Sequence, residues 1–431
     1  MDKSHEELLV MLKEGITPAT GCTEPIAVAY AVAKAREQTT GYLESIQVQV
    51  DSNIYKNGLM VTIPGTHDKG LVFAATYGFL AGKSVKGFRV IEGLTEKNIQ
   101  DAKQFVAQKK ISLLLNRNYR GLHIEVTLMT DQDQVRVITL NHHLNIVSVE
   151  KTDRNSSFAP FIDQDNQANV IQGKIQKYQL ADFLQFIDQI PTKGLEFLEE
   201  GVQMNLQIAQ EGLGMESGVG NKLNEMVKEE ILSDNMISRA QILCAAASQA
   251  RMAGSKLPVM STAGSGNHGI TAFLTNYAVA EKQQLPQQKL LKALALTHLV
   301  TFFIKSYTGT LSAMCGCGVA AGIGASGGVT YLLGGNKEQI MGAFYNMVGS
   351  ISGLICDGAK EGCAYKLALA SGWAVQSALL SLKGAMIHNT DGIVDPDFRL
   401  LFKNLGYLCD PGMIAADQAI LDVMINKKIS L

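Results

Sequence analysis

Hydrophobic and polar positions near the start of the chain follow a helical period. Apolar residues recur every three or four positions in residues 6–15, which predicts an amphipathic helix. A second helix is predicted over 22–38, with Pro25 in its first turn, where the missing N–H breaks no hydrogen bond. We therefore expect residues 1–38 to form helices that pack on a larger helical domain.

The period changes to two after residue 40. Alternating apolar and polar residues predict strands over 45–55, 122–128, 134–140 and 145–151. Asn57-Gly58 supplies a turn, so the chain from 45 to 65 is predicted to form a β-hairpin. A helical pattern intervenes at 97–110, and the polar stretch 161–174 is typical of a connection. Residues 39–176 are therefore predicted to be an α+β domain.

Beyond residue 177 almost every segment has a helical period, interrupted by glycine and proline. The clearest cases are 177–190, 195–210, 221–234, 236–252 and 287–305. Strands do not alternate with helices here, which argues against a doubly wound sheet. The predicted fold class is α+β: an amino-terminal mixed α+β unit and a larger all-α domain over 177–431 with glycine-rich buried helices.

Two uncharged stretches, 306–336 and 339–356, are long enough to cross a bilayer, which takes about 20 apolar residues. The first contains nine glycines and many serines and threonines, whereas a lipid-facing helix is rich in Leu, Ile and Phe. Small residues favour helices packed closely in a protein core near a ligand. We therefore expect no membrane association. The charged amino terminus lacks the apolar segment of a signal peptide, which predicts a cytoplasmic protein.

Composition and charge exclude several other classes of protein. The 431 residues suffice for two domains, and 46% hydrophobic with 18% charged residues excludes a disordered, collagen-like or coiled-coil chain. The net charge of −2, from 38 basic and 40 acidic residues, gives no electrostatic basis for binding nucleic acid. The high apolar content favours a homodimer.

The cysteines are unevenly distributed, and five of the seven lie beyond residue 314. Their local sequences are MCGCG at 314–318 and CDGAKEGC at 356–363, with Cys409 further on. In a cytosolic chain such grouping favours metal or redox chemistry over disulfides, and glycine lets backbone N–H groups approach a thiolate. Small buried residues in helix contacts explain the same pattern, because cysteine is among the most buried residue types. No Cys-x-x-Cys pair occurs, so spacing alone leaves both interpretations open.

Cys22 belongs to a different kind of site, at the predicted start of the helix over 22–38. Unpaired N–H groups and the helix dipole favour a thiolate there, which can act as a nucleophile or a general base. The alternative is a small capping residue between Gly21 and Thr23, which the sequence by itself slightly favours.

Two segments match Gly-x-Gly-x-x-Gly, at 264–269 and 322–327, but neither lies in the βαβ unit that a dinucleotide site requires. The first precedes a predicted helix, so its backbone N–H groups can bind a carboxylate. His268 in that loop is a candidate hydrogen-bonding partner.

Five segments in combination carry a family resemblance: GITPATGCTEPIAVA, DSNIYKNG, STAGSGNHGI, KSYTGTLSAMCGCGVAAG and CDGAKEGCAYK. Together they resemble the L-cysteine desulfidases, which are relatives of the iron–sulfur L-serine dehydratases and do not use pyridoxal phosphate (PLP). The segments run from Gly15 to Lys366 and so cover most of the chain. The GCTEP and CDGAKxGC patterns favour the desulfidase branch.

This resemblance implies a [4Fe-4S] cluster held by three cysteines, with one iron open to substrate as a Lewis acid. Cys356 and Cys363 match the paired ligands of the family. The third ligand is Cys317 or Cys315, and we favour Cys317 because the dehydratases place this ligand in a Gly-Cys step before a small-residue helix. Cys244 and Cys409 match no family ligand and are expected in the core.

The resemblance also implies a small amino-acid substrate and a β-elimination. A base removes the Cα proton, the β-substituent leaves, and 2-aminoacrylate hydrolyses to pyruvate and ammonia, with sulfide as the other product from cysteine. The implied base is Cys22, and Lys305, Tyr307 and Lys360 are expected to orient the substrate or stabilise negative charge. The expected substrate-binding residues are Ser265, Gly266, Asn267 and His268, together with Asn53 and Lys56 from the amino-terminal part.

Two other functions remain open at this stage. The first is an L-serine or L-threonine dehydratase of the same iron–sulfur class, which differs only in its leaving group. The second is a non-catalytic module that binds a metal and an amino acid.

Overall fold

The computed structural model describes residues 3–117, 119, 121–161 and 170–427. Contacts divide this part of the chain into two units. The helical unit contains residues up to 19, 170–356 and 361–417, and the sheet unit contains 20–161, 357–360 and 418–427. The fold is α+β, with a smaller sheet-containing part and a larger helical part, as predicted.

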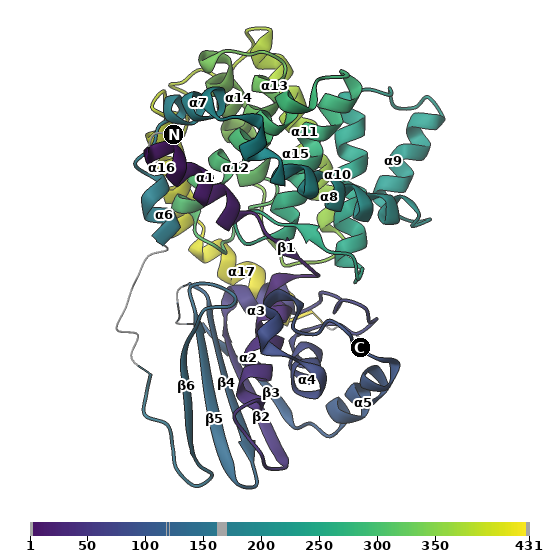
Figure 1. The fold of residues 1–431 in the computed structure, drawn as a ribbon, viewed down its shortest axis with the longest axis vertical. Coiled ribbons are helices and arrows are strands. Elements are labelled where there is room, and N and C mark those ends of the chain that lie inside the picture. Colours follow the sequence, from purple (N-terminus) through teal and green to yellow (C-terminus); the bar gives the residue numbers. More distant parts are fainter. Residues whose placement is uncertain (1–2, 118, 120, 162–169, 428–431) are drawn as a thin grey trace. The chain divides into compact units, whose positions relative to one another are not determined.

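The sheet unit is built on five strands in the order β3-β2-β4-β5-β6, in which β2 and β3 are parallel and the other pairs antiparallel (Figure 1). The strands are β2 (Leu43–Asp51), β3 (Ile111–Asn116), β4 (His123–Thr130), β5 (Asp133–Leu140) and β6 (Ile146–Asp153). The helices are α2 (Thr23–Arg36), α3 (Ser52–Gly58), α4 (Leu71–Ala81), η1 (Ser84–Arg89) and α5 (Glu96–Ala107). In β2 the buried Ile46, Val48 and Val50 alternate with the more exposed Gln47 and Gln49, as the period of two predicts.

The predicted hairpin over 45–65 is wrong. β2 ends at Asp51, whose carboxylate accepts hydrogen bonds from the backbone N–H groups of Asn53 (2.7 Å) and Ile54 (3.2 Å) and so starts α3. The partners of β2 are β3 and β4, which are distant in sequence. Residues 59–65 contain only an isolated bridge from Thr62 to Lys69, so the Asn57-Gly58 pair lies at the end of a helix rather than in a turn.

The helical unit contains most of the remaining elements. Its first half has α1 (Lys3–Gly15), α6 (Val170–Ile175), α7 (Leu180–Gln189), η2 (Thr192–Leu195), α8 (Phe197–Leu213), α9 (Val219–Lys228), α10 (Met236–Met252) and α11 (Gly266–Lys282). Its second half has α12 (Gln287–Thr308), α13 (Ala320–Leu332), α14 (Lys337–Ile351), α15 (Cys363–Leu382), α16 (Phe398–Tyr407) and η3 (Leu408–Gly412). α17 (Ile414–Ile425) runs from this unit into the sheet unit, and a short pair joins β1 (Pro18–Ala19) to β7 (Val259–Met260).

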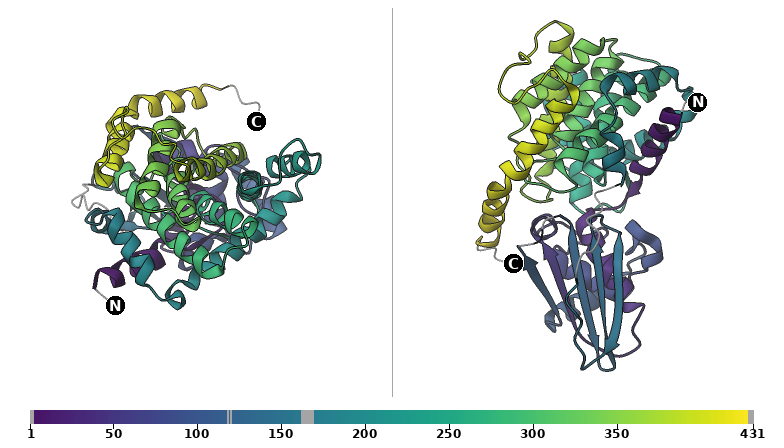
Figure 2. Two further views of the ribbon diagram at one scale, coloured as in Figure 1. Left: turned by 90° about the horizontal axis from the view of Figure 1, so that it is seen from above. Right: turned by 90° about the vertical axis from the view of Figure 1, so that its left-hand side faces the viewer.

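Large apolar side chains of many helices form one continuous core in the helical unit. α12 contacts α13, α11 and α16, and α15 contacts α10, α13 and α14. These helices are labelled in Figure 1, and Figure 2 shows the helical unit from two further sides. α12 is long and apolar enough to cross a membrane, but 83% of its most apolar window is buried in the protein, as in the core helix of a bundle. The stretch 306–336 instead spans the end of α12 and the buried α13.

The units divide the chain differently from the predicted domain boundaries. α1 belongs to the helical unit, whereas α2 belongs to the sheet unit, although both lie in the predicted segment 1–38. Residues 357–360 and 418–427 belong to the sheet unit, although they lie in the predicted helical domain 177–431. The predicted connection over 161–174 falls largely on 162–169, which lie outside the described residues.

We predict that Gly212→Ala destabilises the protein by about 1–3 kcal/mol. A Cβ at Gly212 on α8 would lie 2.0 Å from the carbonyl oxygen of Ala246 on α10, and this backbone atom cannot rotate away. The control is Gly173→Ala in α6, where a Cβ meets nothing within 4 Å. Urea unfolding of both variants measures the difference, and equal unfolding midpoints would contradict the prediction.

Candidate active site

The two cysteine-bearing segments of the helical unit are joined by a short antiparallel pairing. The backbone N–H of Cys315 donates to the carbonyl of Leu354 (2.8 Å), and that of Cys356 donates to the carbonyl of Ala313 (2.6 Å). Met314 and Ile355 form the isolated bridge between them. This pairing fixes Cys315 and Cys356 on neighbouring segments, although α13 and α14 separate them in sequence.

Cys317 and Cys363 complete a group of four cysteines, which we call the four-thiol group. Cys363 is the first residue of α15, and Cys317 lies three residues before α13. The pKa of Cys317 lies well above its usual range. The largest cause is the hydrogen bond to Cys315, followed by burial and by the negative charge of neighbouring Cys315, Cys363 and Cys356. None of the seven cysteines forms a disulfide.

Cys315 lies in an environment that favours the thiolate. Hydrogen bonds from the Cys317 side chain and from the backbone N–H groups of Gly318 and Cys317 outweigh burial and lower the pKa of Cys315 to about 6. Lys366 acts in the same direction. Backbone N–H groups directed at a thiolate are typical of iron–sulfur proteins.

Lys305 near the end of α12 is the cation of this site. Its side chain is 4% exposed, and its Nζ donates to the carbonyl of Thr310 (3.1 Å). Burial lowers the pKa of Lys305, whereas Cys409 and members of the four-thiol group act in the opposite direction. A buried amine beside several thiols is well placed to compensate negative charge on sulfur.

The polar loop before α11 lies next to the four-thiol group. The hydroxyl oxygen of Ser265 is 4.0 Å from Sγ of Cys317. Ala263 and Gly264 both have positive φ in the turn closed by the bridge from Thr262 to Ser265, and Ala263 is strained by it. A Cβ on Gly316 would lie 2.4 Å from Nε2 of His268, so only glycine lets the two segments approach this closely.

His268 is a neutral imidazole in this site. Burial, with smaller contributions from Lys305 and Arg251, lowers the pKa of His268 to about 3. Its Nδ1 is 3.3 Å from the carbonyl oxygen of Thr262, which only accepts, so Nδ1 carries the proton and Nε2 is an acceptor. Behind it, Nδ1 of His298 contacts the hydroxyl of Thr262 (2.9 Å).

The predicted residues of the sheet unit form a second polar group around Glu24, which is 5% exposed. The Cys22 thiol donates to Oε2 of Glu24 (2.8 Å), and the amide nitrogen of Asn57 donates to Oε1 (3.0 Å). His143 lies near the same carboxylate (3.9 Å), and burial lowers its pKa. Cys22 precedes α2 as predicted, but it makes no capping hydrogen bond, and its proton is directed at a carboxylate.

Asn53 and Lys56 also lie in the sheet unit, on α3. Oδ1 of Asn53 is buried without a hydrogen-bond partner, and Lys56 is 1% exposed. Asp51 at the start of α3 is 1% exposed, and burial raises its pKa to about 7. The DSNIYKNG and GCTEP segments therefore meet in one unit through Asn57 and Glu24.

Tyr307 and Lys360 contact residues of their own units. Cβ of Tyr307 approaches Gly406 of α16, and its ring contacts Phe303 edge-on, so Tyr307 packs away from Lys305. Lys360 belongs to the sheet unit and pairs with Asp357 (2.5 Å).

The described residues contain no group of three or more His, Cys, Asp or Glu side chains that could hold one metal ion. An iron–sulfur cluster does not require such a group, because its cysteines bind different iron atoms. The donor set of the four-thiol group, with backbone N–H groups and a lysine beside it, fits such a cluster chemically.

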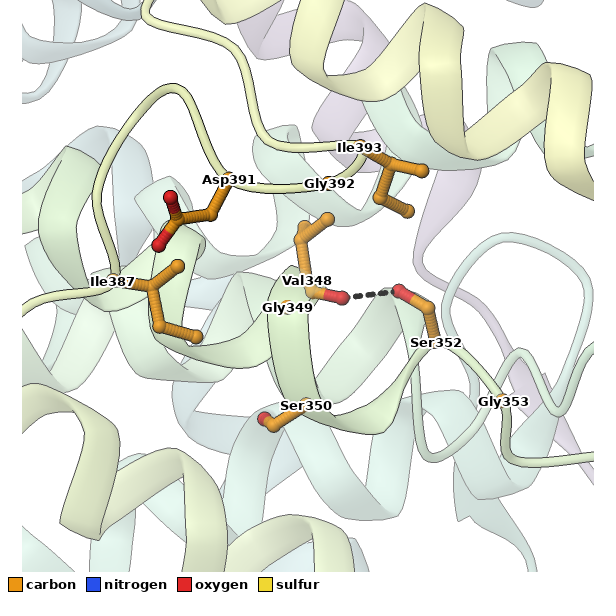
Figure 3. Close-up of a pocket in the computed structure, with 9 residues that line it drawn as sticks. All are labelled: Val348, Gly349, Ser350, Ser352, Gly353, Ile387, Asp391, Gly392 and Ile393. Atoms are coloured by element: carbon orange, nitrogen blue, oxygen red, sulfur yellow. Dashed lines mark hydrogen bonds between the residues drawn. The ribbon is translucent and has the colours of Figure 1, made fainter.

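A pocket of about 360 Å³ lies at the end of α14 and is shown in Figure 3. Asp391 is the only charged side chain among the nine described residues that line it. The hydroxyl of Ser352 donates to the carbonyl of Val348 (2.6 Å) at its wall. No predicted site residue lines this pocket, so it is not the candidate active site.

Comparison with known proteins identifies the family. The model of the serine dehydratase alpha chain matches residues 85–422. The chain belongs to the serine dehydratase alpha-chain family. Membership supports a lyase of the dehydratase type and is consistent with iron–sulfur chemistry.

The relatives that match over almost the whole chain have names that state no substrate. A UPF0597 protein of Clostridium tetani is 41% identical over 98% of this chain and 99% of its own length. One from Caldanaerobacter subterraneus is 42% identical over 98% of this chain and 100% of its own length. One from Clostridioides difficile is 39% identical over 96% of this chain and 98% of its own length.

Two residues of the candidate site were not predicted from the sequence. Arg251 donates through Nη1 to Oδ1 of Asn267 (2.9 Å), but it sits in an ordinary helical pattern that gave no signal. Cys409 was expected in the core; it is buried there, and it is also the largest thiol influence on Lys305. Only a prediction that η3 contacts the end of α12, where the Cys409 thiol donates to the carbonyl of Thr308, would have found it.

We predict that His298→Gln makes the protein less sensitive to acid. Burial lowers the pKa of His298 to about 3, whereas its ordinary value in the unfolded chain is 6.5. Between pH 3 and pH 6.5 the unfolded state therefore binds a proton on this imidazole that the folded state does not bind. This histidine therefore stabilises the fold above pH 6.5, and that stability is lost as the pH falls towards 3. The slope of unfolding free energy against pH should fall in the variant by up to about 1.4 kcal/mol per pH unit.

Urea unfolding at several pH values in that window measures the slope. His388→Gln, at an exposed position of the same unit, is the control. Equal slopes for wild type and His298→Gln would contradict the prediction.

Proposed function

We propose that this chain catalyses an iron–sulfur-dependent, PLP-independent β-elimination of L-cysteine to pyruvate, ammonia and sulfide. Family membership supports an elimination reaction, and the GCTEP and CDGAKEGC segments support the cysteine branch. The observation that carries the proposal is the four-thiol group beside buried Lys305 and the polar loop at Ser265.

We assign Cys317, Cys356 and Cys363 as the ligands of a [4Fe-4S] cluster. Cys317 is favoured over Cys315 because it stands in the Gly-Cys step before a small-residue helix, and because the Ser265 hydroxyl of the proposed substrate loop lies 4.0 Å from its Sγ. When bound, such a cluster supplies a Lewis acid through the iron that no cysteine holds.

The chain's own residues then bind the substrate and move its proton. Ser265, Gly266, Asn267 and His268 hold the carboxylate or amino group, and Lys305 compensates negative charge on sulfur. Nδ1 of His268 carries the proton toward Thr262, so Nε2 is the proposed acceptor for the substrate's ammonium group. Tyr307 is left out because it packs on α16.

The sheet unit supplies the proposed base, Cys22. Its thiol proton passes along the 2.8 Å hydrogen bond to Glu24, and the resulting thiolate takes the Cα proton of the substrate. Asn53 and Lys360 of the same unit are the remaining proposed substrate-binding residues.

Two assays of anaerobically purified protein test the reaction. Sulfide and pyruvate are measured with L-cysteine and with L-serine, alongside iron and acid-labile sulfide. A larger kcat/KM for L-cysteine supports the desulfidase. A larger kcat/KM for L-serine indicates the second candidate, a serine dehydratase, which the family description favours. A colourless protein without iron or elimination activity indicates a binding module and overturns the proposal.

We predict that Cys356→Ser or Cys363→Ser removes the cluster and the activity together. Changes to residues around a metal site typically lower metal affinity about 10- to 100-fold, and loss of a ligand itself should cost at least as much. Iron content and visible absorption should therefore be largely lost in both variants. The control is Cys244→Ala, because Cys244 is fully buried in the core and donates to the carbonyl of Ile270. Unchanged iron content in the ligand variants would contradict the assignment.

We predict that Cys22→Ser keeps the visible absorption and loses turnover. A missing general base should lower kcat by about 10²- to 10⁴-fold. Thr23→Val is the matched control, because Thr23 also donates to Glu24 (3.1 Å) but has no role in proton transfer. If Cys22→Ser bleaches the protein, Cys22 acts at the cluster rather than as the base.

A further inference from the structure

Arg251, near the end of α10, is a buried cation that no motif indicated. Its side chain is 3% exposed, and its Nη1 donates to Oδ1 of Asn267 (2.9 Å). A Cβ on Gly266 would lie 2.5 Å from Nε and 2.7 Å from Cζ of Arg251, so the guanidinium lies directly against the start of α11. Burying a guanidinium costs free energy unless its donors are paired, so this placement requires a reason.

The hydrogen bond fixes which way the Asn267 amide faces. A guanidinium only donates, so the atom of Asn267 that contacts Arg251 must be the oxygen. The NH₂ group of Asn267 is therefore held on the other side of the amide as a donor. A carboxylate accepts from such a group, whereas an ammonium group cannot.

The surroundings of Asn267 favour negative charge. Asn267 lies in the first turn of α11, a helix of 17 residues, where backbone N–H groups carry partial positive charge. Lys305 and Arg251 both act on neighbouring His268 as positive charges. Ser265, just before α11, connects this region to Cys317 of the four-thiol group.

Another arginine of α10 shows a different arrangement. Arg239 donates to both carboxylate oxygens of Glu281 (2.6 and 2.9 Å). Arg251 donates to the oxygen of an amide, whose two ends differ, so this bond fixes the orientation of the Asn267 side chain.

We propose that Arg251 is a positioning residue that makes this site selective for a free carboxylate. It holds Asn267 with the amide nitrogen toward the ligand, and its charge adds to the attraction of an anion. The identity of the ligand, a small amino acid, rests on the proposed function. An amino acid whose carboxylate is replaced by a carboxamide loses the charge that the site recognises.

L-Alanine and L-alaninamide test this selectivity in the intact, cluster-loaded protein. L-Alanine keeps the carboxylate but has no leaving group on Cβ, so its binding can be measured by calorimetry without turnover. We expect Arg251→Met to weaken L-alanine binding about 10- to 100-fold, as for loss of a hydrogen bond to a charged group, and to remove the preference over L-alaninamide. With L-cysteine, KM should rise more than kcat falls.

Three further variants separate positioning from general stability. Arg239→Met, the matched control on the same helix, should keep the preference for L-alanine. Arg251→Lys keeps the charge but loses the planar fork, so its preference should be intermediate. Asn267→Asp can still accept from Arg251 but offers no donor, so it should lose the preference even if Arg251→Met fails to fold.

The inference is overturned if Arg251→Met or Asn267→Asp keeps the wild-type ratio of L-alanine to L-alaninamide affinity. A wild-type protein that prefers L-alanine yet eliminates nothing from L-cysteine or L-serine would overturn the proposed function alone. A wild-type protein with no preference would overturn the role of Arg251, whatever its activity.

Discussion

The antiparallel pairing of residues 313–315 with 354–356 is the constraint on which the helical unit's candidate site depends. Its backbone hydrogen bonds place Cys315 beside Leu354 and Cys356 beside Ala313. Cys317 follows directly toward α13, and Cys363 starts α15. The four-thiol group is thus a consequence of main-chain pairing between two loops, each of which leads into a buried helix.

Two buried positive charges determine the electrostatics of the site in the helical unit. Lys305 and Arg251 are both almost fully buried, and both act as positive charges on His268. Burying two cations is unfavourable unless partners with negative charge or lone pairs surround them. Thiols, backbone carbonyls and the Asn267 amide fill that role, and together they make a region suited to thiolates and an anionic ligand.

The chemistry of the chain is divided between its two units. The thiols, Lys305 and the Ser265 loop belong to the helical unit, whereas Cys22 and Glu24 belong to the sheet unit. The segment between Cys356 and Cys363 belongs partly to each, because residues 357–360 group with the sheet unit. Each unit therefore has its own polar group, built by its own hydrogen bonds.

The sequence by itself determined the elements with strong local periodicity and the chemistry of the motifs. α5, α7 and α8, and strands β4 and β6, follow the predicted pattern because each buries one face. α10 and β5 also form where predicted, although they are buried almost all round. The prediction of a hairpin over 45–65 was wrong. The carboxylate of Asp51 caps α3 and so ends β2, and β2 pairs with strands that are distant in sequence. The cysteine motifs were visible because glycine and cysteine together are locally unusual.

Only the tertiary structure decided which of these residues meet. Lys305 and Tyr307 are two positions apart on α12, so they face opposite sides of the helix, and only Lys305 reaches the thiols. Arg251 joins the site through the packing of α10 on α11, and Cys409 of η3 joins it through its contact with Thr308 at the end of α12. Contacts between distant helices leave no local signature in the chain, because they depend on which buried faces pack together.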